Sequence, residues 1–303
     1  MTWSGVWPAI TTPFDTQGAV DLPRLERHVR WLLASGCAGV VVLGSLGETA
    51  TLSHEERVAI TTHAREAVGQ RTRLLVGVSG ASTRDAVRWA REAERLDAGG
   101  LMVLPPYIYR GDPRETDLHF DAILDAVSLP AMLYNNPVAY GTDVPPEQVL
   151  ALAARHRNLV AVKESSGDLR RMTSLGLSVT SPIDLFVGID DQIVEGILLG
   201  ARGWIAGLAN AFPVESVALF EHARAGRSEE ARALYRWFLP LLRMDTEPKF
   251  VQLIKLAEEA VGQGSPRVRP PRQELEGAER ERVSAIINAA LSTRPALPRP
   301  SPF

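Results

Sequence analysis

A lysine and a tyrosine that each lie at the end of an apolar run are the residues best placed for chemistry. Lys163 follows Leu159–Val162, and Tyr134 ends the run that begins at Ala131. Burial at a strand end desolvates an amine, lowers its pKa and frees it for Schiff-base formation with a ketone. A neighbouring tyrosine hydroxyl can move the protons of that reaction. The same positions also suit a lysine that reaches the rim or pairs with Glu164, and a half-buried tyrosine with a hydrogen-bonded hydroxyl.

Two loops contain further groups that suit such a site. The segment Gly44-Ser-Leu-Gly-Glu48 follows another apolar run, and its glycines let backbone N–H groups approach an anion while Ser45 adds a hydroxyl. The segment also fits a plain turn between a strand and a helix. Tyr107 follows two prolines on a rigid loop, so it can reach its own pocket or a neighbour's, or lie on the surface.

Metal and redox chemistry find little support in the sequence. The chain has one cysteine, Cys37, which excludes an intramolecular disulfide and any multi-cysteine zinc or iron–sulfur site. The pair Asp190-Asp191 allows a metal site, but a helix N-cap is the simpler interpretation. These residues by themselves therefore give little reason to expect a metal site. Metal-ligand spacing is also missing among the histidines, which are His28, His54, His63, His119, His156 and His222.

Eight short apolar runs recur through the first two thirds of the chain. Their residues are apolar at both odd and even positions, which is typical of parallel strands covered on both faces. Amphipathic stretches between the runs predict helices, two of which start at Ser53-His-Glu-Glu56 and Ser82-Thr-Arg-Asp85. The runs are Val6–Ile10, Val40–Leu43, Leu74–Val76, Leu101–Leu104, Ala131–Tyr134, Leu159–Val162, Ile183–Val187 and Trp204–Ala206.

Eight strand–helix units predict a closed barrel of parallel strands, for which about 225 residues is a usual size. An open doubly wound sheet is the alternative, but no Gly-x-Gly-x-x-Gly turn follows the first run. We predict an α/β fold: a (β/α)8 TIM barrel over residues 1–225, a C-terminal helical domain over 226–293 and a proline-rich, extended or disordered tail over 294–303. The three C-terminal helices are expected at about 229–243, 247–261 and 277–292.

Composition narrows the classes of function. Of the 303 residues 45% are hydrophobic and 23% are charged, and the net charge is −3. This balance argues against a nucleic acid or an anionic membrane as the main partner. We recognise neither the basic region of a signal peptide nor an apolar stretch long enough to span a bilayer, so we expect a soluble, cytoplasmic protein.

Taken together, several segments resemble one family. The chain is similar to the dihydrodipicolinate synthase / N-acetylneuraminate lyase family of class I aldolases and dehydratases, from about Val6 to about Leu291. The matching segments are Ala9-Ile-Thr-Thr-Pro-Phe14, Gly44-Ser-Leu-Gly-Glu48, Tyr134-Asn-Asn-Pro137 and Val162-Lys-Glu-Ser-Ser-Gly-Asp168.

The resemblance implies a mechanism and a partner chain. Lys163 would form a Schiff base with the keto group of a 2-oxo acid, and Tyr134 would be the proton shuttle. Tyr107 matches a family tyrosine that crosses into the neighbouring subunit in the synthases. The family usually forms a homotetramer built as a dimer of dimers, and it implies neither a cofactor nor a catalytic metal.

The resemblance also implies how the substrate is held. Ser45 and the backbone N–H groups of Ser45 and Leu46 would bind the substrate carboxylate, in the loop that begins at Gly44. Gly188 and Ile205 match positions whose backbone carbonyls line the pocket. The expected partner is thus a small 2-oxo acid or a cyclic imino acid.

Two departures from the synthases bear on the substrate. The synthases have two adjacent threonines, the second of which belongs to their proton relay, where this chain has Ser45-Leu46. They also have an arginine shortly after Tyr-Asn-x-Pro that binds the second substrate's carboxylate, whereas this chain has Val138-Ala-Tyr-Gly141. A second carboxylate would lose its bidentate partner. Both departures argue against lysine biosynthesis, and Leu46 also argues against a sialic-acid lyase.

Further segments resemble one branch of the family, the Δ1-pyrroline-4-hydroxy-2-carboxylate deaminases. Our preferred hypothesis is that deaminase activity, which yields 2,5-dioxopentanoate and ammonia. The alternatives are a 4-hydroxy-tetrahydrodipicolinate synthase-like enzyme, an aldolase or dehydratase of a 2-keto-3-deoxy sugar acid or 4-hydroxy-2-oxoglutarate, and a non-catalytic protein that binds a 2-oxo acid. The segments are Leu101–Arg110, Tyr134–Gly141, Trp204–Pro213 and Val268–Arg272.

Overall fold

A closed barrel of eight parallel strands forms the centre of the computed structural model, which describes residues 3–177 and 183–297. From β2 to β8 each strand pairs with the next one in the sequence, β8 pairs with β1, and an isolated bridge between Ala9 and Val41 closes the ring between β1 and β2. The predicted TIM barrel is therefore confirmed. Its strands are β1 (Gly5–Pro8), β2 (Val40–Val42), β3 (Leu74–Val78), β4 (Gly100–Val103), β5 (Ala131–Asn135), β6 (Leu159–Glu164), β7 (Asp184–Val187) and β8 (Gly203–Ala206).

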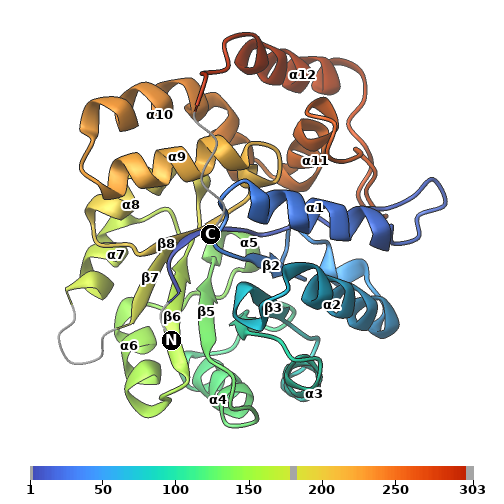
Figure 1. Ribbon diagram of the computed structural model, residues 1–303. Helices are drawn as coiled ribbons and strands as arrows, with labels where there is room; N and C mark the ends of the chain where they lie inside the picture. Colours follow the sequence, from blue (N-terminus) through green and yellow to red (C-terminus); the bar gives the residue numbers. More distant parts are fainter. Residues whose placement is uncertain (1–2, 178–182, 298–303) are drawn as a thin grey trace.

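Helices surround the barrel (Figure 1). Ser53 and Glu56 form the predicted capping box at the start of α2, and the Ser82 side chain caps α3 as expected. The α-helices before the C-terminal ones are α1 (Leu22–Ala34), α2 (His54–Val68), α3 (Thr83–Arg95), α4 (Pro113–Leu124), α5 (Pro137–Tyr140), α6 (Pro146–Arg155), α7 (Leu169–Gly176), α8 (Ile193–Leu198) and α9 (Pro213–Arg224). Short 3-10 helices are η1 (Thr49–Thr51), η2 (Arg71–Arg73), η3 (Asp190–Gln192) and η4 (Leu208–Asn210).

The C-terminal helices pack together beside α9 and α1 (Figure 1). They are α10 (Ser228–Leu242), α11 (Phe250–Ala260) and α12 (Gly277–Ser292). A 3-10 turn, η5 (Arg243–Thr246), follows α10, so the helix predicted from about residue 247 begins three residues later. Of the tail predicted over 294–303, residues 298–303 lie outside the described residues, and at its start Arg294 binds the buried carboxylate of Glu215.

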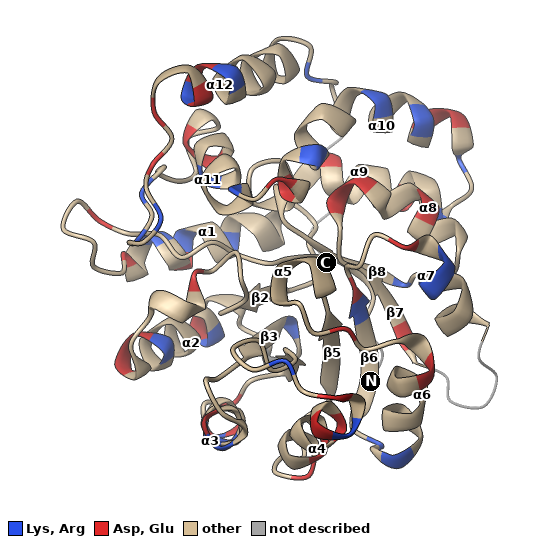
Figure 2. Cartoon of the chain, turned by 180° about the vertical axis from the view of Figure 1, so that it is seen from behind, with Lys and Arg blue, Asp and Glu red and all other residues tan. Residues whose placement is uncertain are grey.

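Burial explains why the strands read as continuous apolar runs. Their residues face either the barrel interior or the surrounding helices, so both faces are covered by side chains. Charged side chains of both signs are distributed mainly over the outer helices and loops (Figure 2). Within the described part of the chain, no helix combines the length and the apolar character that crossing a membrane requires.

Candidate active site

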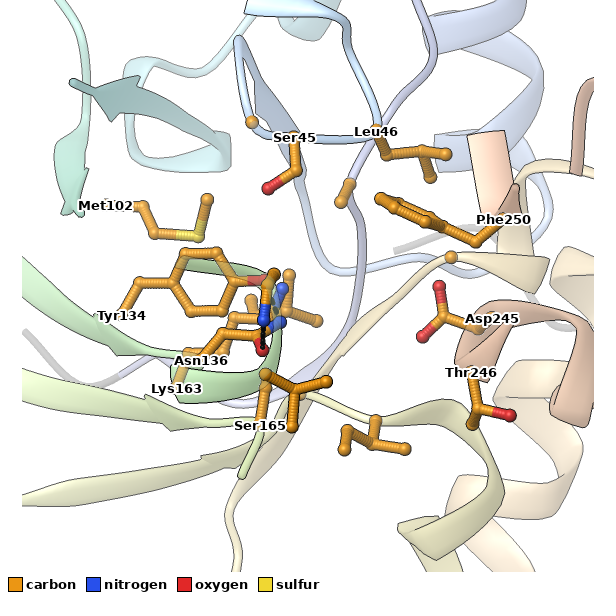
Figure 3. A pocket seen from close by; sticks show the side chains of 18 of the residues that line it. Ser45, Leu46, Met102, Tyr134, Asn136, Lys163, Ser165, Asp245, Thr246 and Phe250 are labelled. Atoms are coloured by element: carbon orange, nitrogen blue, oxygen red, sulfur yellow. Dashed lines mark hydrogen bonds between the residues drawn. The ribbon is translucent and has the colours of Figure 1, made fainter. Parts of the chain in front are cut away.

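A cavity of about 500 Å³ lies where the barrel strands end at their carboxyl termini. Its walls come from the loops after several strands and from the segment between η5 and α11, and Figure 3 shows many of the side chains. Seven of the eight sequence-predicted site residues line it, and they are Gly44, Ser45, Leu46, Tyr134, Lys163, Gly188 and Ile205.

Lys163 extends into the barrel rather than to its rim. It is opposite Tyr134 in the register of β6 and β5, so both side chains project from the same face of the sheet. Lys163 is 6% exposed, and its Nζ lies 4.0 Å from the centre of the Tyr134 ring. The alternative of a pair with Glu164 is wrong, because that carboxylate accepts hydrogen bonds from Asn135 Nδ2 at 3.1 Å and from the Ser166 N–H at 2.6 Å.

Gly188 makes room for the lysine stem. A Cβ atom at Gly188 would lie 2.8 Å from Lys163 Cε and 1.9 Å from Ser165 Oγ, so a larger residue would displace both side chains. Ser165 is buried, and its Oγ has no hydrogen-bond partner among the described residues. Sequence reasoning included Ser165 only within the segment Val162–Asp168 that resembles the family, and assigned it no role.

The Tyr134 hydroxyl is held so that it can still donate a proton. It accepts a hydrogen bond of 3.0 Å from Asn136 Nδ2. The other end of the same amide caps α5, because Asn136 Oδ1 accepts from the Ala139 N–H at 3.0 Å. Since Asn136 is fixed from both sides, the tyrosine oxygen has a defined position and its O–H remains available to a ligand.

The loop after β2 contains the expected anion-binding groups. Neither the Ser45 N–H nor the Leu46 N–H donates to another described residue, so both can bind a carboxylate. The Ser45 hydroxyl is hydrogen-bonded to the hydroxyl of Tyr140, the last residue of α5.

Tyr140 is a residue that sequence reasoning missed. Its ring meets the Tyr134 ring edge-on, with centres 5.7 Å apart, and burial raises the pKa of its phenol well above the ordinary value. Tyr140 therefore stays protonated and brings a second hydroxyl to Ser45, beside Leu46, which has none. The segment Val138-Ala-Tyr-Gly141 was read for its lack of arginine, and the tyrosine in it was the available signal.

Tyr107 occupies a different position from the other predicted residues. It is not among the described residues that line the cavity, and its ring packs against Tyr140 with centres 5.9 Å apart. A role across a subunit interface stays a prediction for this residue.

The sequence suggested that Asp190 caps a helix, but the structure shows a different role. It lies inside η3, and its buried carboxylate accepts hydrogen bonds from the N–H groups of Gly207 and Leu208 and from Trp204 Nε1. Its energy of burial is thus offset by three donors that fix the turn after β8.

Asp245 is the second residue that sequence reasoning missed. It belongs to η5, lies on the cavity wall and turns its carboxylate towards the cavity (Figure 3). Burial raises the pKa of Asp245 to about 6, although the positive charge of Lys163 opposes the rise. No strand ends at this residue, so the rule used to choose candidates could not find it.

One group of potential metal ligands lies away from the cavity. Glu26, His63 and Glu66 could share an ion among the described residues, although the histidine spacing in the sequence had suggested no such site. His63 Nδ1 lies 2.5 Å from Glu26 Oε1, so this contact between α1 and α2 is explained as a structural pair.

Comparison with known proteins identifies the family. The family model described as the dihydrodipicolinate synthetase family matches residues 2–290. The chain belongs to this family. It is 36% identical over 283 residues to 4-hydroxy-tetrahydrodipicolinate synthase 1 of Streptomyces coelicolor, covering 93% of this chain and 91% of the relative. The family of Schiff-base lyases thus accounts for the fold and makes this protein a class I enzyme.

Two further relatives of the dihydrodipicolinate synthetase family show its range. The "Probable 2-dehydro-3-deoxy-D-pentonate aldolase YjhH" of Escherichia coli is 33% identical over 264 residues, which is 86% of this chain and 88% of the relative. The structure of YagE, a prophage protein of E. coli K12 in complex with pyruvate, has a TM-score of 0.90 and 28% identity, covering 96% of this chain and 99% of that one.

Proposed function

We propose that this enzyme is a Schiff-base deaminase that converts 1-pyrroline-4-hydroxy-2-carboxylate to 2,5-dioxopentanoate and ammonia. One observation carries the proposal: among the described residues that line the cavity, Lys163 is the only lysine or arginine. An enzyme that condenses two acids has to hold a second carboxylate, and arginine is the usual partner for it. The pyrroline has a single carboxylate, which suits this cavity.

The reaction uses one water overall. Lys163 attacks C2 of the ring imine, the ring opens, and the resulting protein-bound imine acts as an electron sink for loss of the 4-hydroxyl as water. Water then releases ammonia at C5, and a further water frees the 2-oxo acid from Lys163. One water leaves and two enter, so the sum is substrate plus water giving 2,5-dioxopentanoate plus ammonia.

Most of the predicted residues have a place in this proposal, whereas Tyr107 has none. The N–H groups of Ser45 and Leu46 bind the carboxylate, and Tyr134 transfers protons at C3 and during hydrolysis of the Lys163 imine. Tyr140, bonded to Ser45, supplies the hydroxyl that Leu46 lacks. Gly188 and Ile205 line the cavity beside the ligand. No cofactor or metal is needed for these steps, and a homotetramer stays a prediction, testable by light scattering.

The proposal is tested by ammonia release from the synthetic pyrroline, measured with a coupled dehydrogenase. We expect turnover by the wild type and none above background by Lys163→Ala. Equal rates for the two proteins would exclude the deaminase function.

The relatives favour a second candidate, an aldolase or synthase, because one is named a pentonate aldolase and another a 4-hydroxy-tetrahydrodipicolinate synthase. Pyruvate release from 2-keto-3-deoxy sugar acids, detected with lactate dehydrogenase, would support the aldolase. Consumption of pyruvate with aspartate semialdehyde would support the synthase. A protein that gives no borohydride-trapped adduct with any of these substrates would be a non-catalytic binder.

A further inference from the structure

The cavity wall contains two carboxylates among its described residues, and their surroundings differ. Glu247 is held by Arg282, whose Nη atoms lie 3.2 and 2.8 Å from its oxygens. Asp245 has no arginine or lysine partner of this kind within the described chain, and Lys163 is the cation whose charge acts on it. A carboxylate that faces a cavity without a fixed counter-ion can pair with a cationic group of a ligand.

Contacts with the turn after β8 hold Asp245 at the cavity. A Cβ atom at Gly207 would lie 2.6 Å from Asp245 Oδ1, so only glycine after β8 allows this approach. The Asp190 side chain fixes the N–H of Gly207 at 3.0 Å, and the Asp190 backbone N–H donates to Asp245. The carboxylate is therefore held in place before any ligand binds, which is how acid–base groups are positioned in active sites.

Ser165 gives an independent sign that a polar ligand enters this space. It is 1% exposed, lines the cavity with Lys163, and has an Oγ atom without a partner among the described residues. A buried hydroxyl without a hydrogen bond costs about 1–3 kcal/mol, so its retention points to a partner that arrives with the substrate.

We propose that Asp245 is a further catalytic residue, which binds the ring nitrogen of a cyclic imino acid and passes protons to it. This inference rests on the proposed function and assigns the recognition of the substrate's ring nitrogen to Asp245. A plain 2-oxo acid has no such atom and gains nothing from Asp245. An acid whose pKa is about 6 can both accept and donate a proton near neutral pH.

The proton balance of ring opening defines what Asp245 does. The neutral Lys163 amine forms a bond from Nζ to C2, and the bond between C2 and the ring nitrogen then breaks. The electron pair of the broken bond goes to the ring nitrogen. Nζ loses two protons as its double bond to C2 forms, and Asp245 carries them one at a time to the former ring nitrogen, which becomes a primary amine.

The test compares two ligands that differ in one ring atom. Calorimetric titration of the wild type with L-proline and with tetrahydrofuran-2-carboxylate measures the preference for a charged nitrogen over an ether oxygen. We expect proline to bind at least about tenfold more tightly, as one charge-assisted hydrogen bond provides, and we expect Asp245→Asn to reduce the ratio to about threefold or less. Glu247→Gln is the matched control and should keep the ratio.

Turnover of the pyrroline is measured on the same proteins. We expect Asp245→Asn to lower ammonia release by about 10²-fold or more. A wild type without preference for proline, or an Asp245→Asn protein that keeps the preference or the full rate, overturns the proposal. The wild-type titration decides this even if the variant folds poorly. If the wild type prefers proline but releases no ammonia, the deaminase function fails while nitrogen recognition at Asp245 stands.

Discussion

Two lysines of this protein are buried, and their surroundings are opposite. Lys255, on α11, is 1% exposed, and its Nζ lies 2.6 Å from Glu48 Oε1, 2.8 Å from the Thr12 carbonyl and 2.6 Å from the Arg267 carbonyl. Lys163 is 6% exposed, faces the cavity over the Tyr134 ring, and forms no ion pair with a described residue.

The comparison separates two uses of a buried amine. Lys255 has three acceptors for its three donors, so it is bound as an ammonium and joins α11 to the loop that ends at Glu48. Lys163 has room and no acceptor in the described chain, so its amine can react with an incoming carbon. Burial alone therefore does not indicate a reactive lysine; the lack of local partners beside a cavity does.

The same substitution should have opposite effects at the two lysines. Lys163→Met is expected to lower turnover by roughly 10⁴-fold or more, because the atom that bonds to the substrate is gone. Its free energy of unfolding should stay within about 1 kcal/mol, since no hydrogen-bond partner is left behind. Steady-state ammonia assays and urea unfolding measure the two effects, and a strongly destabilised Lys163→Met would contradict the account.

Lys255→Met should have the reverse effect. It removes the ammonium that lies 2.6 Å from Glu48, which is 1% exposed, and leaves Arg272 at 3.9 Å from the other carboxylate oxygen. Breaking such a buried pair costs up to about 3–5 kcal/mol. Urea unfolding at neutral pH measures the loss. Folded Lys255→Met should still form a borohydride-trapped adduct, and the double variant with Glu48→Gln should lose less stability than the sum of the two single variants.

These residues also show how far sequence reasoning reaches. Lys163 and Tyr134 were predictable because each ends an apolar strand, and the parallel register then places them side by side. Asp245 was not, since it reaches the cavity from a 3-10 turn about eighty residues further along the chain, where no local pattern indicates which way a side chain points. The role of Asp190 was not predictable, because the groups that donate hydrogen bonds to its carboxylate belong to β8 and to the turn that follows it.

Removal of the Tyr140 hydroxyl tests whether the hydroxyl pair at the loop after β2 transfers protons. Tyr140→Phe is expected to lower kcat by about 10²-fold with a smaller change in KM, because the hydroxyl bonded to Ser45 is part of the proposed proton path. Tyr107→Phe is the matched control, and in this account its effect is smaller. If Tyr107→Phe costs as much, the relay depends on the tyrosine that the family resemblance places at a subunit interface.

The pH dependence of stability should report the cluster around Lys255. Burial raises the pKa of Glu258 from its ordinary 4.5 to about 8, although hydrogen bonds from Thr11 and the charge of Lys255 oppose the rise. The folded state then binds more protons than the unfolded one, so this group lowers the free energy of unfolding progressively from pH 4.5 to 8. Glu258→Gln should flatten that part of the profile measured by urea unfolding, and an unchanged slope would count against the assignment.

The contrast between the two lysines is tested most directly by reduction of the protein with borohydride in the presence of the pyrroline, followed by peptide mass spectrometry. The account predicts one covalent adduct on the peptide that contains Lys163, none on the peptide that contains Lys255, and none in Lys163→Met. An adduct on Lys255, or no adduct on Lys163 in a protein that releases ammonia, would contradict it.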